Sequence, residues 1–429
     1  MGVRAEQAKH RRHQEQEAEG CEPDGAASLA AMYLYGDVLE SVVARVPAPD
    51  LAATARVSRE WLRAVRAALR RRPRRLPWLV VHLQGAGGRR CAAAYDPRSG
   101  AWLAAPAPPR HATPSHVRLV RGARGDRVCA LSLSGLAVAG DPLGAAACVA
   151  LAAPGVWRVD PVFAAVGGRV VAIGGACHLA LAEGEDAAAV EVHDGGGWTA
   201  CEPMPDALRE SAAATWLSAA ATDKRVYLVE RATGWASWFD PAERRWGPAR
   251  RLGPDAAVST WAVAHGSAGA GASERLVLFG AKRADKEAGC RVVIQTWEVD
   301  GDTLEPVPSA SSDAMPSEIS ERLFHRDDDD DDDDDEDLND TPPAIGVCGN
   351  GAGGYVYNAA EPANGAVLYE LREAEEGSAV ARWEWVPCAP AVRAEPLGRA
   401  ILACSPVGVD DLARAAGRRV PRVCAAAAH

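Results

Sequence analysis

The chain has 429 residues, enough for two or three domains. Its formal net charge is −11, but eleven consecutive carboxylates occupy Asp327–Asp337; the other 47 acidic residues balance 47 basic ones, so the acidity is local. The eleven cysteines include no C-x-x-C pair and no Cys/His cluster at metal-ligand spacing, and their number is odd. Composition therefore argues against a disulfide framework, a zinc site and an acidic folded body.

The sequence predicts neither a signal peptide nor a membrane span. The first 20 residues are charged and lack an apolar centre, so we expect no signal peptide and predict a disordered tail over residues 1–28. Pro142–Trp157 is the longest nearly uncharged run, but it is too short for a membrane span and contains two prolines. We expect no membrane partner and a location in the cytoplasm, the nucleus or both.

Leu34–Leu69 is the first patterned stretch, and it predicts short helices. Asp37 can cap a helix start, with Glu40 three residues later as in a capping box. An apolar stripe follows, and Pro47 ends this helix. Pro49 and Asp50 suit the first turn of a second helix. That second helix is expected to carry two apolar lines, one of Leu51, Ala55, Ser58, Leu62, Val65 and Leu69, the other of Val57 and Trp61.

Helices this short cannot bury enough apolar surface to stand alone, so the stripes predict a partner. The stretch resembles the F-box, the helical module that docks on the Skp adaptor of cullin-based ubiquitin ligases. The resemblance covers about 40 residues, with Tyr35-Gly36 where the family usually has Leu-Pro and Ser58 where it usually has Cys. The alternative is an ordinary helical hairpin packed on its own domain.

The resemblance implies an F-box over residues 29–72 and an adaptor-binding surface within it. Trp61 is the strongest hot-spot candidate by residue type. Some members of the set are expected to be core rather than interface. The expected adaptor-binding residues are Leu34, Val38, Leu39, Val42, Val43, Val46, Pro47, Leu51, Val57 and Trp61.

Arg70–Pro77 is a basic hinge after the helices. Arginines at a helix C-terminus complement its dipole, and no aromatic residues interleave with them to stack on bases. We therefore expect no nucleic-acid partner.

From Trp78 to about Cys404, short β-rich runs alternate with Gly, Pro, Asp and Asn, which predicts an all-β region. Two segments repeat most clearly: Tyr95–Trp102 and Phe239–Trp246 both place an aromatic residue, Asp-Pro and Trp at the same offsets. Each predicts a strand, a tight turn and a return strand, with the aromatic residue and Trp packed across the hairpin.

These repeats resemble kelch repeats, whose blades are four-stranded sheets arranged as a propeller. The resemblance implies a mainly β fold over residues 78–404, a kelch-type β-propeller of six blades behind the helical module. Gly398–Cys404 is expected to return as a last strand that completes the first blade, before a C-terminal tail at 405–429. The predicted first edges lie near Trp78, His116, Phe163, Ser211, Trp261 and Ala344.

Two further segments invite ligand-binding interpretations. Asp327–Asp337 could suggest calcium, but like charges repel, the EF-hand spacing is missing, and we predict an acidic disordered insertion at about 309–342. Gly349–Gly354 matches G-x-G-x-x-G, yet Tyr355-Val-Tyr continues as a strand where a dinucleotide site needs a helix. We predict a β-turn there.

No catalytic motif stands out, and the histidines are scattered. Copper-radical oxidases also use kelch-type propellers, but the spacing suggests no converging His, Tyr and Cys set, so we expect no catalytic residue, metal or cofactor. The resemblance implies a plant F-box/kelch protein, the substrate receptor of an SCF-type E3 ubiquitin ligase. It would bind the Skp adaptor, and cullin through it, and hold an unknown client on the propeller loops, with enzymes of phenylpropanoid or flavonoid synthesis favoured. The alternative is a kelch interaction scaffold outside any ligase.

Overall fold

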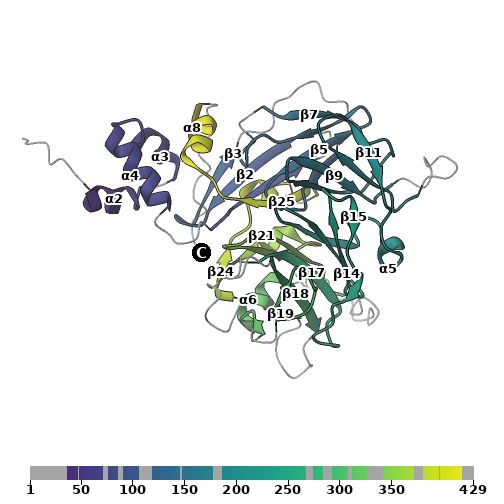
Figure 1. Ribbon diagram of the computed structural model, residues 1–429. Helices are drawn as coiled ribbons and strands as arrows, with labels where there is room; N and C mark the ends of the chain where they lie inside the picture. Colours follow the sequence, from purple (N-terminus) through teal and green to yellow (C-terminus); the bar gives the residue numbers. More distant parts are fainter. Residues whose placement is uncertain are drawn as a thin grey trace, which may run out of the picture.

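The computed structural model describes residues 36–46, 48–70, 76–85, 90–105, 118–144, 147–176, 186–266, 274–283, 292–307, 312–325, 342–371, 380–395 and 397–417. A small group of helices lies beside a β-propeller (Figure 1). None of the helices within these ranges combines the length and the apolar character needed to cross a membrane.

Three short helices, which we call the helical module, precede the propeller: α2 (Gly36–Val43), α3 (Ala48–Thr54) and α4 (Arg59–Arg70). The prediction of one second helix running to Leu69 is wrong. The chain leaves the helix after Thr54, and Ser58 starts α4, because its Oγ accepts a hydrogen bond from the Trp61 backbone N–H at 3.2 Å. A serine hydroxyl at this position satisfies an N–H group that has no partner within the helix.

Six antiparallel sheets form the blades, as predicted from the repeats. Blade 1 contains β25 (Arg399–Ser405), β1 (Trp78–Gln84), β2 (Arg90–Asp96) and β3 (Ala101–Ala105). Blade 2 contains β4 (Arg118–Arg121), β5 (Val128–Ser132), β6 (Gly135–Val138) and β7 (Val149–Ala152). Blade 3 contains β8 (Val162–Val166), β9 (Arg169–Ile173), β10 (Val190–His193) and β11 (Trp198–Cys201). Blade 4 contains β12 (Leu217–Ala221), β13 (Val226–Glu230), β14 (Trp235–Asp240) and β15 (Arg245–Trp246), with an added β16 (Arg250–Arg251) that pairs with β14. Blade 5 contains β17 (Thr260–His265), β18 (Arg275–Arg283), β19 (Val292–Asp300) and β20 (Asp313–Ala314). Blade 6 contains β21 (Ile345–Asn350), β22 (Gly353–Asn358), β23 (Ala366–Leu371) and β24 (Val380–Val386).

The innermost strands form the ring of the propeller. Each contacts the next, in the order β25, β4, β8, β12, β17 and β21, and β21 returns to β25. β25 pairs with β1 along its whole length, from Trp78 opposite Ser405 to Gln84 opposite Arg399. The predicted closure is therefore confirmed: the C-terminal strand supplies the inner edge of blade 1.

The repeated hairpins have the predicted contacts. Tyr95 lies opposite Trp102 with ring centroids 5.4 Å apart, and Phe239 lies opposite Trp246 at 5.1 Å. Asp96 Oδ1 accepts a hydrogen bond from the Arg98 N–H at 3.0 Å and so holds the turn. The glycine-rich segment also behaves as predicted, because Asn350 and Gly353 pair as the last residues of a β21–β22 hairpin.

The prediction of disorder across 309–342 is wrong for residues 312–325. They form β20, which completes blade 5, and helix α6 (Ser317–Leu323), which packs on β19. Leu323 is buried, and the buried Ser320 hydroxyl donates to the Val292 carbonyl at 2.6 Å, which gives the segment its own anchors. Asp327–Asp337 lies outside the described residues, as do residues 1–28.

The prediction of a bare C-terminal tail at 405–429 is also wrong, because helix α8 (Val409–Gly417) lies within it. Figure 1 shows α8 between the helical module and the propeller, and α8 contacts α3. The described residues contain further short helices, α5 (Asp206–Arg209), η3 (Pro362–Asn364) and α7 (Pro390–Ala394).

The helical module shares one apolar cluster with the rest of the chain. Leu39, Val43 and Val65 of the module belong to the same cluster as Val80 of β1 and Leu412 of α8. The unpartnered stripes expected from the sequence are thus partly covered from within the chain.

Candidate functional site

The predicted adaptor-binding residues separate into three groups by burial. Leu39, Val43 and Leu51 are buried in the shared cluster, whereas Val38 and Val57 are 59% and 64% exposed. A residue can bind a partner directly only if it reaches the surface, so the first group acts as core and the second can act as interface. Half-buried members are Val42, Val46 and Trp61, and Leu34 and Pro47 lie outside the described residues.

The alternation of Val38 and Leu39 follows from what covers α2. Adjacent helical residues point about 100° apart, so one faces α4 and the shared cluster while its neighbour faces outward. At the end of α2, the Val46 carbonyl accepts a hydrogen bond from the Arg98 guanidinium in the β2–β3 turn. This bond ties the module to blade 1 at a point separate from the apolar cluster.

Helix α8 covers α3 and was missed from the sequence. Val409, Leu412 and Ala415 are buried at intervals of three residues. Asp411 Oδ2 accepts a hydrogen bond from the Gly408 N–H at 2.8 Å, as a residue at the third helical position does in a capping box. This spacing, together with the acidic first turn, was a signal that could have identified the helix.

The exposed face of the helical module is basic as well as apolar. Arg59, Arg63 and Arg66 of α4 are exposed and lie four and three residues apart, so they follow one side of the helix. The module also exposes Asp37, Asp50 and Glu60, so its surface offers both charges together with the exposed valines to a partner.

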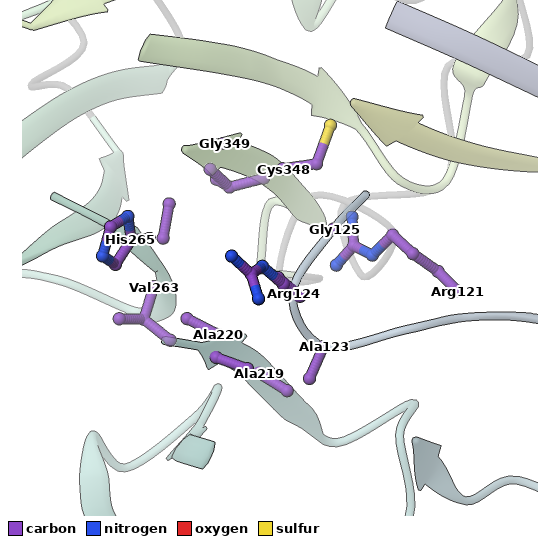
Figure 2. A pocket seen from close by; sticks show the side chains of 13 residues that line it. Arg121, Ala123, Arg124, Gly125, Ala219, Ala220, Val263, His265, Cys348 and Gly349 are labelled. Carbon is purple, nitrogen blue, oxygen red and sulfur yellow. The ribbon is translucent and has the colours of Figure 1, made fainter. Parts of the chain in front are cut away.

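The propeller contains two cavities along its axis. The narrow one measures about 10 Å³, room for about one water molecule, and Figure 2 shows Arg124, His265, Cys348 and Gly349 around it. Burial lowers the pKa of His265, which favours its neutral form. The ends of the inner strands form this cavity.

The starts of the inner strands form the wider cavity, which measures about 460 Å³. This volume falls within the range of small-molecule and cofactor pockets. Arg121, Ala123 and Ala219 line both cavities. Within the described ranges, no three His, Cys, Asp or Glu side chains are grouped so as to hold a metal ion.

Comparison with known proteins points to one family. No protein-family model matches the chain. An F-box/kelch-repeat protein of Arabidopsis thaliana is 31% identical to it over 392 residues, which span 88% of this chain and 91% of that protein. Among solved structures, the hydrazine synthase of Kuenenia stuttgartiensis has a TM-score of 0.36 and 10% identity over 65% of this chain and 70% of its own. A eukaryotic initiation factor has a TM-score of 0.28 and 12% identity over 73% and 74%. Scores this low carry no argument about function.

Proposed function

The chain belongs to the F-box/kelch-repeat family, and from that premise we propose that it is the substrate-recognition subunit of an SCF-type E3 ubiquitin ligase. The identity over 88% of the chain carries this proposal, together with a helical module that precedes a propeller. In this role the helical module binds the Skp adaptor, and cullin through it, while the propeller binds a client protein.

The work of such a subunit is positioning. Holding a client lysine near the charged ubiquitin-conjugating enzyme makes an encounter effectively intramolecular, which raises the rate without covalent chemistry by the receptor. We therefore propose a non-catalytic protein, acting in the cytoplasm, the nucleus or both, on clients such as enzymes of phenylpropanoid or flavonoid synthesis.

The adaptor-binding surface in this proposal centres on Val38 and Val57. Both side chains are more than half exposed, and both belong to the set expected from the F-box resemblance. Leu39, Val43 and Leu51 would support this surface from beneath rather than touch the adaptor, since they are buried.

The test is binding of the full chain to a plant Skp adaptor, measured by surface plasmon resonance. Val38→Arg with Val57→Arg is expected to weaken binding at least tenfold, because it places two charges in an apolar contact. Val149→Arg on β7 is the matched control, since Val149 is 55% exposed but lies on blade 2. No adaptor binding by the unmodified chain would contradict the proposal.

A kelch scaffold outside any ligase is the second candidate, and one observation favours it. The module shares its core with blade 1 and α8, as expected of helices that only cap a propeller. This candidate predicts a folded chain that leaves the adaptor unbound, so the same binding measurement separates the two functions.

A further inference from the structure

Four arginines converge on the wider axial cavity. Arg118 and Arg121 come from β4, Arg231 follows β13, and Arg399 begins β25, so three different blades contribute. We call this site the arginine cavity. Of the described residues that line it, Asp160 alone is acidic.

The positive charge of the arginine cavity is largely uncompensated. Asp160 Oδ1 accepts from Arg118 at 2.9 Å, while its Oδ2 already accepts from the Thr215 N–H at 2.7 Å and the Thr215 hydroxyl at 2.6 Å. Among the residues that the structure describes, Arg121, Arg231 and Arg399 have no carboxylate within ion-pair distance. Arg121 and Arg231 therefore face the cavity without a nearby carboxylate, and Arg399 interacts only with the charge of Asp160, which already pairs with Arg118.

These three guanidinium groups are held by neutral oxygens. Arg121 donates to the Tyr357 hydroxyl at 3.0 Å, Arg231 to the Ile345 carbonyl at 2.7 Å and Arg399 to the Leu119 carbonyl at 2.8 Å. A guanidinium has five N–H donors, so one or two bonds fix its direction and leave others for a ligand. The arginines are thus preorganised rather than neutralised.

Mutual repulsion is built into the arrangement. Burial lowers the pKa of Arg231 to about 10, with the charge of Arg121 adding to this and Tyr357 opposing it. The pKa of Arg121 itself is raised, because the effect of its burial is outweighed by Tyr357, Cys348 and Cys404. Burial, and then the charge of Arg118, lowers the pKa of Arg399. An anion placed among these groups would relieve the repulsion, which is a favourable contribution to binding.

The remaining walls indicate what kind of anion fits. Val120, Val162, Leu217 and Ile401 lie between the arginines, so the cavity offers apolar walls as well as charge. Arginine pairs with carboxylates through two parallel hydrogen bonds. Aspartate and glutamate side chains on a peptide supply carboxylates together with hydrocarbon, and the volume of about 460 Å³ admits a few such residues.

We propose that the arginine cavity binds an acidic segment of the client protein, with its carboxylates on Arg121, Arg231 and Arg399. This inference rests on the proposed function, because it assumes that the propeller has a protein client. The chain itself offers a second source of the same chemistry. Asp327–Asp337 comes shortly before Ala344 and Ile345, which line the cavity.

The test is fluorescence anisotropy of the full chain with a labelled ten-residue Asp/Glu peptide at about 0.15 M salt, where non-specific attraction is largely screened. Arg231→Gln with Arg399→Gln is expected to weaken peptide binding at least tenfold. Arg244→Gln with Arg250→Gln is the matched control. It removes the same charge from two arginines that form exposed ion pairs with Asp194 and Glu305. The control is expected to change binding less than twofold.

The proposal would be overturned if the two double variants changed peptide binding equally. It would also be overturned if neither the unmodified chain nor a chain lacking Asp327–Asp337 bound the peptide. The deletion also separates the two sources of carboxylates. Tighter peptide binding after deletion would show that the chain's own carboxylates compete for the arginines; unchanged binding would show that the cavity is open to a client. Both results support an anionic site.

Adaptor binding measured on the same preparations keeps this inference distinct from the proposed function. The Arg231→Gln and Arg399→Gln variant is expected to bind the adaptor as the unmodified chain does, and an unchanged melting transition of its propeller shows that it folds. A chain that binds the peptide but no adaptor would contradict the ligase role and leave the anionic site standing.

Discussion

Each propeller blade pairs its strands within a single sheet, whereas the helical module draws its core from both ends of the chain. In blade 3, for example, β8 to β11 are consecutive in sequence and hydrogen-bonded in order. The module instead packs on β1 and on α8. Helix α8 also reaches blade 2, where Arg414 Nε lies 3.6 Å from Asp141 Oδ2. Blades 2 to 6 can therefore be specified by local repeats, while the module, like the β1–β25 pairing of blade 1, depends on contacts across more than 300 residues.

The largest effects are expected from shortening the C-terminus. Deleting residues 399–429 removes β25, which opens the ring and exposes the edge of β1, so the cooperative unfolding transition should be lost. Deleting 408–429 removes only α8, so the propeller should stay folded while α2–α4 lose protection. Hydrogen exchange followed by mass spectrometry checks both. Equal protection of α2–α4 with and without α8 would contradict the shared core.

The second prediction separates core from surface within the module. Leu39→Arg with Val43→Arg places two unpaired charges where the side chains are 3% and 0% exposed, which costs several kcal/mol for each. The module is expected to unfold while the propeller keeps its melting transition, as calorimetry would show. Val38→Arg with Val57→Arg should leave both transitions unchanged, because those positions are exposed. Loss of adaptor binding in the first variant would therefore not identify an interface.

The third prediction concerns a buried ion pair in blade 3, between Arg158 and Glu191. The Arg158 side chain is buried, with Nη2 2.8 Å from Glu191 Oε2 and Nη1 donating to the Gly174 and Ala189 carbonyls at 2.5 and 2.9 Å. Arg158→Met leaves a buried carboxylate without its cation, so we expect a loss of about 3–5 kcal/mol in the free energy of unfolding.

The matched control is Arg250→Met, whose ion pair with Glu305 is exposed on both sides. Exposed pairs contribute about 1 kcal/mol or less. Urea denaturation of both variants gives the comparison. A small effect of Arg158→Met would show that the ring does not depend on this buried pair.

The smallest expected effect is a dependence on pH at the boundary between the two regions. His82 lies on β1 two residues after Val80, on the face that meets the module, and burial lowers its pKa to about 4 from 6.5. The unfolded chain therefore binds the proton first, so stability is full above pH 6.5 and falls as the pH drops toward 4, by up to about 3 kcal/mol.

Thermal melts between pH 7.5 and pH 4 test this dependence. His82→Gln is expected to flatten the decline in stability between pH 6.5 and pH 4 relative to the unmodified chain. Identical slopes for the two proteins would mean that other groups cause the acid sensitivity.

Local patterns were enough to predict the propeller. The Tyr95–Trp102 and Phe239–Trp246 repeats fix a turn and a cross-strand pair within eight residues, so no distant information is needed. The closing strand was also predictable, because Gly398–Cys404 has the apolar character of a strand without a partner nearby. β20 could not be found this way, since two residues carry no periodicity.

The candidate sites were harder to predict from the sequence, because the exposure of a residue depends on which other parts of the chain cover it. Val38 and Leu39 have nearly the same chemistry, and only the positions of α4 and the shared cluster decide which one is buried. The arginine cavity has no motif at all. Arg121, Arg231 and Arg399 are single residues on separate blades, brought together only when the ring closes.

Closure by β25 also sets an order of events during synthesis. Trp78 pairs with Ser405, so β1 must wait for about 330 further residues to be made. At about 5–20 residues per second, this takes roughly 15 to 65 s. During that interval the edge of blade 1 and the side of α3 that contacts α8 are without their partners, and nascent chains would need protection from association. A chain that ends before Arg399 would therefore contain blades 2 to 6 and three strands of blade 1, but no closed ring.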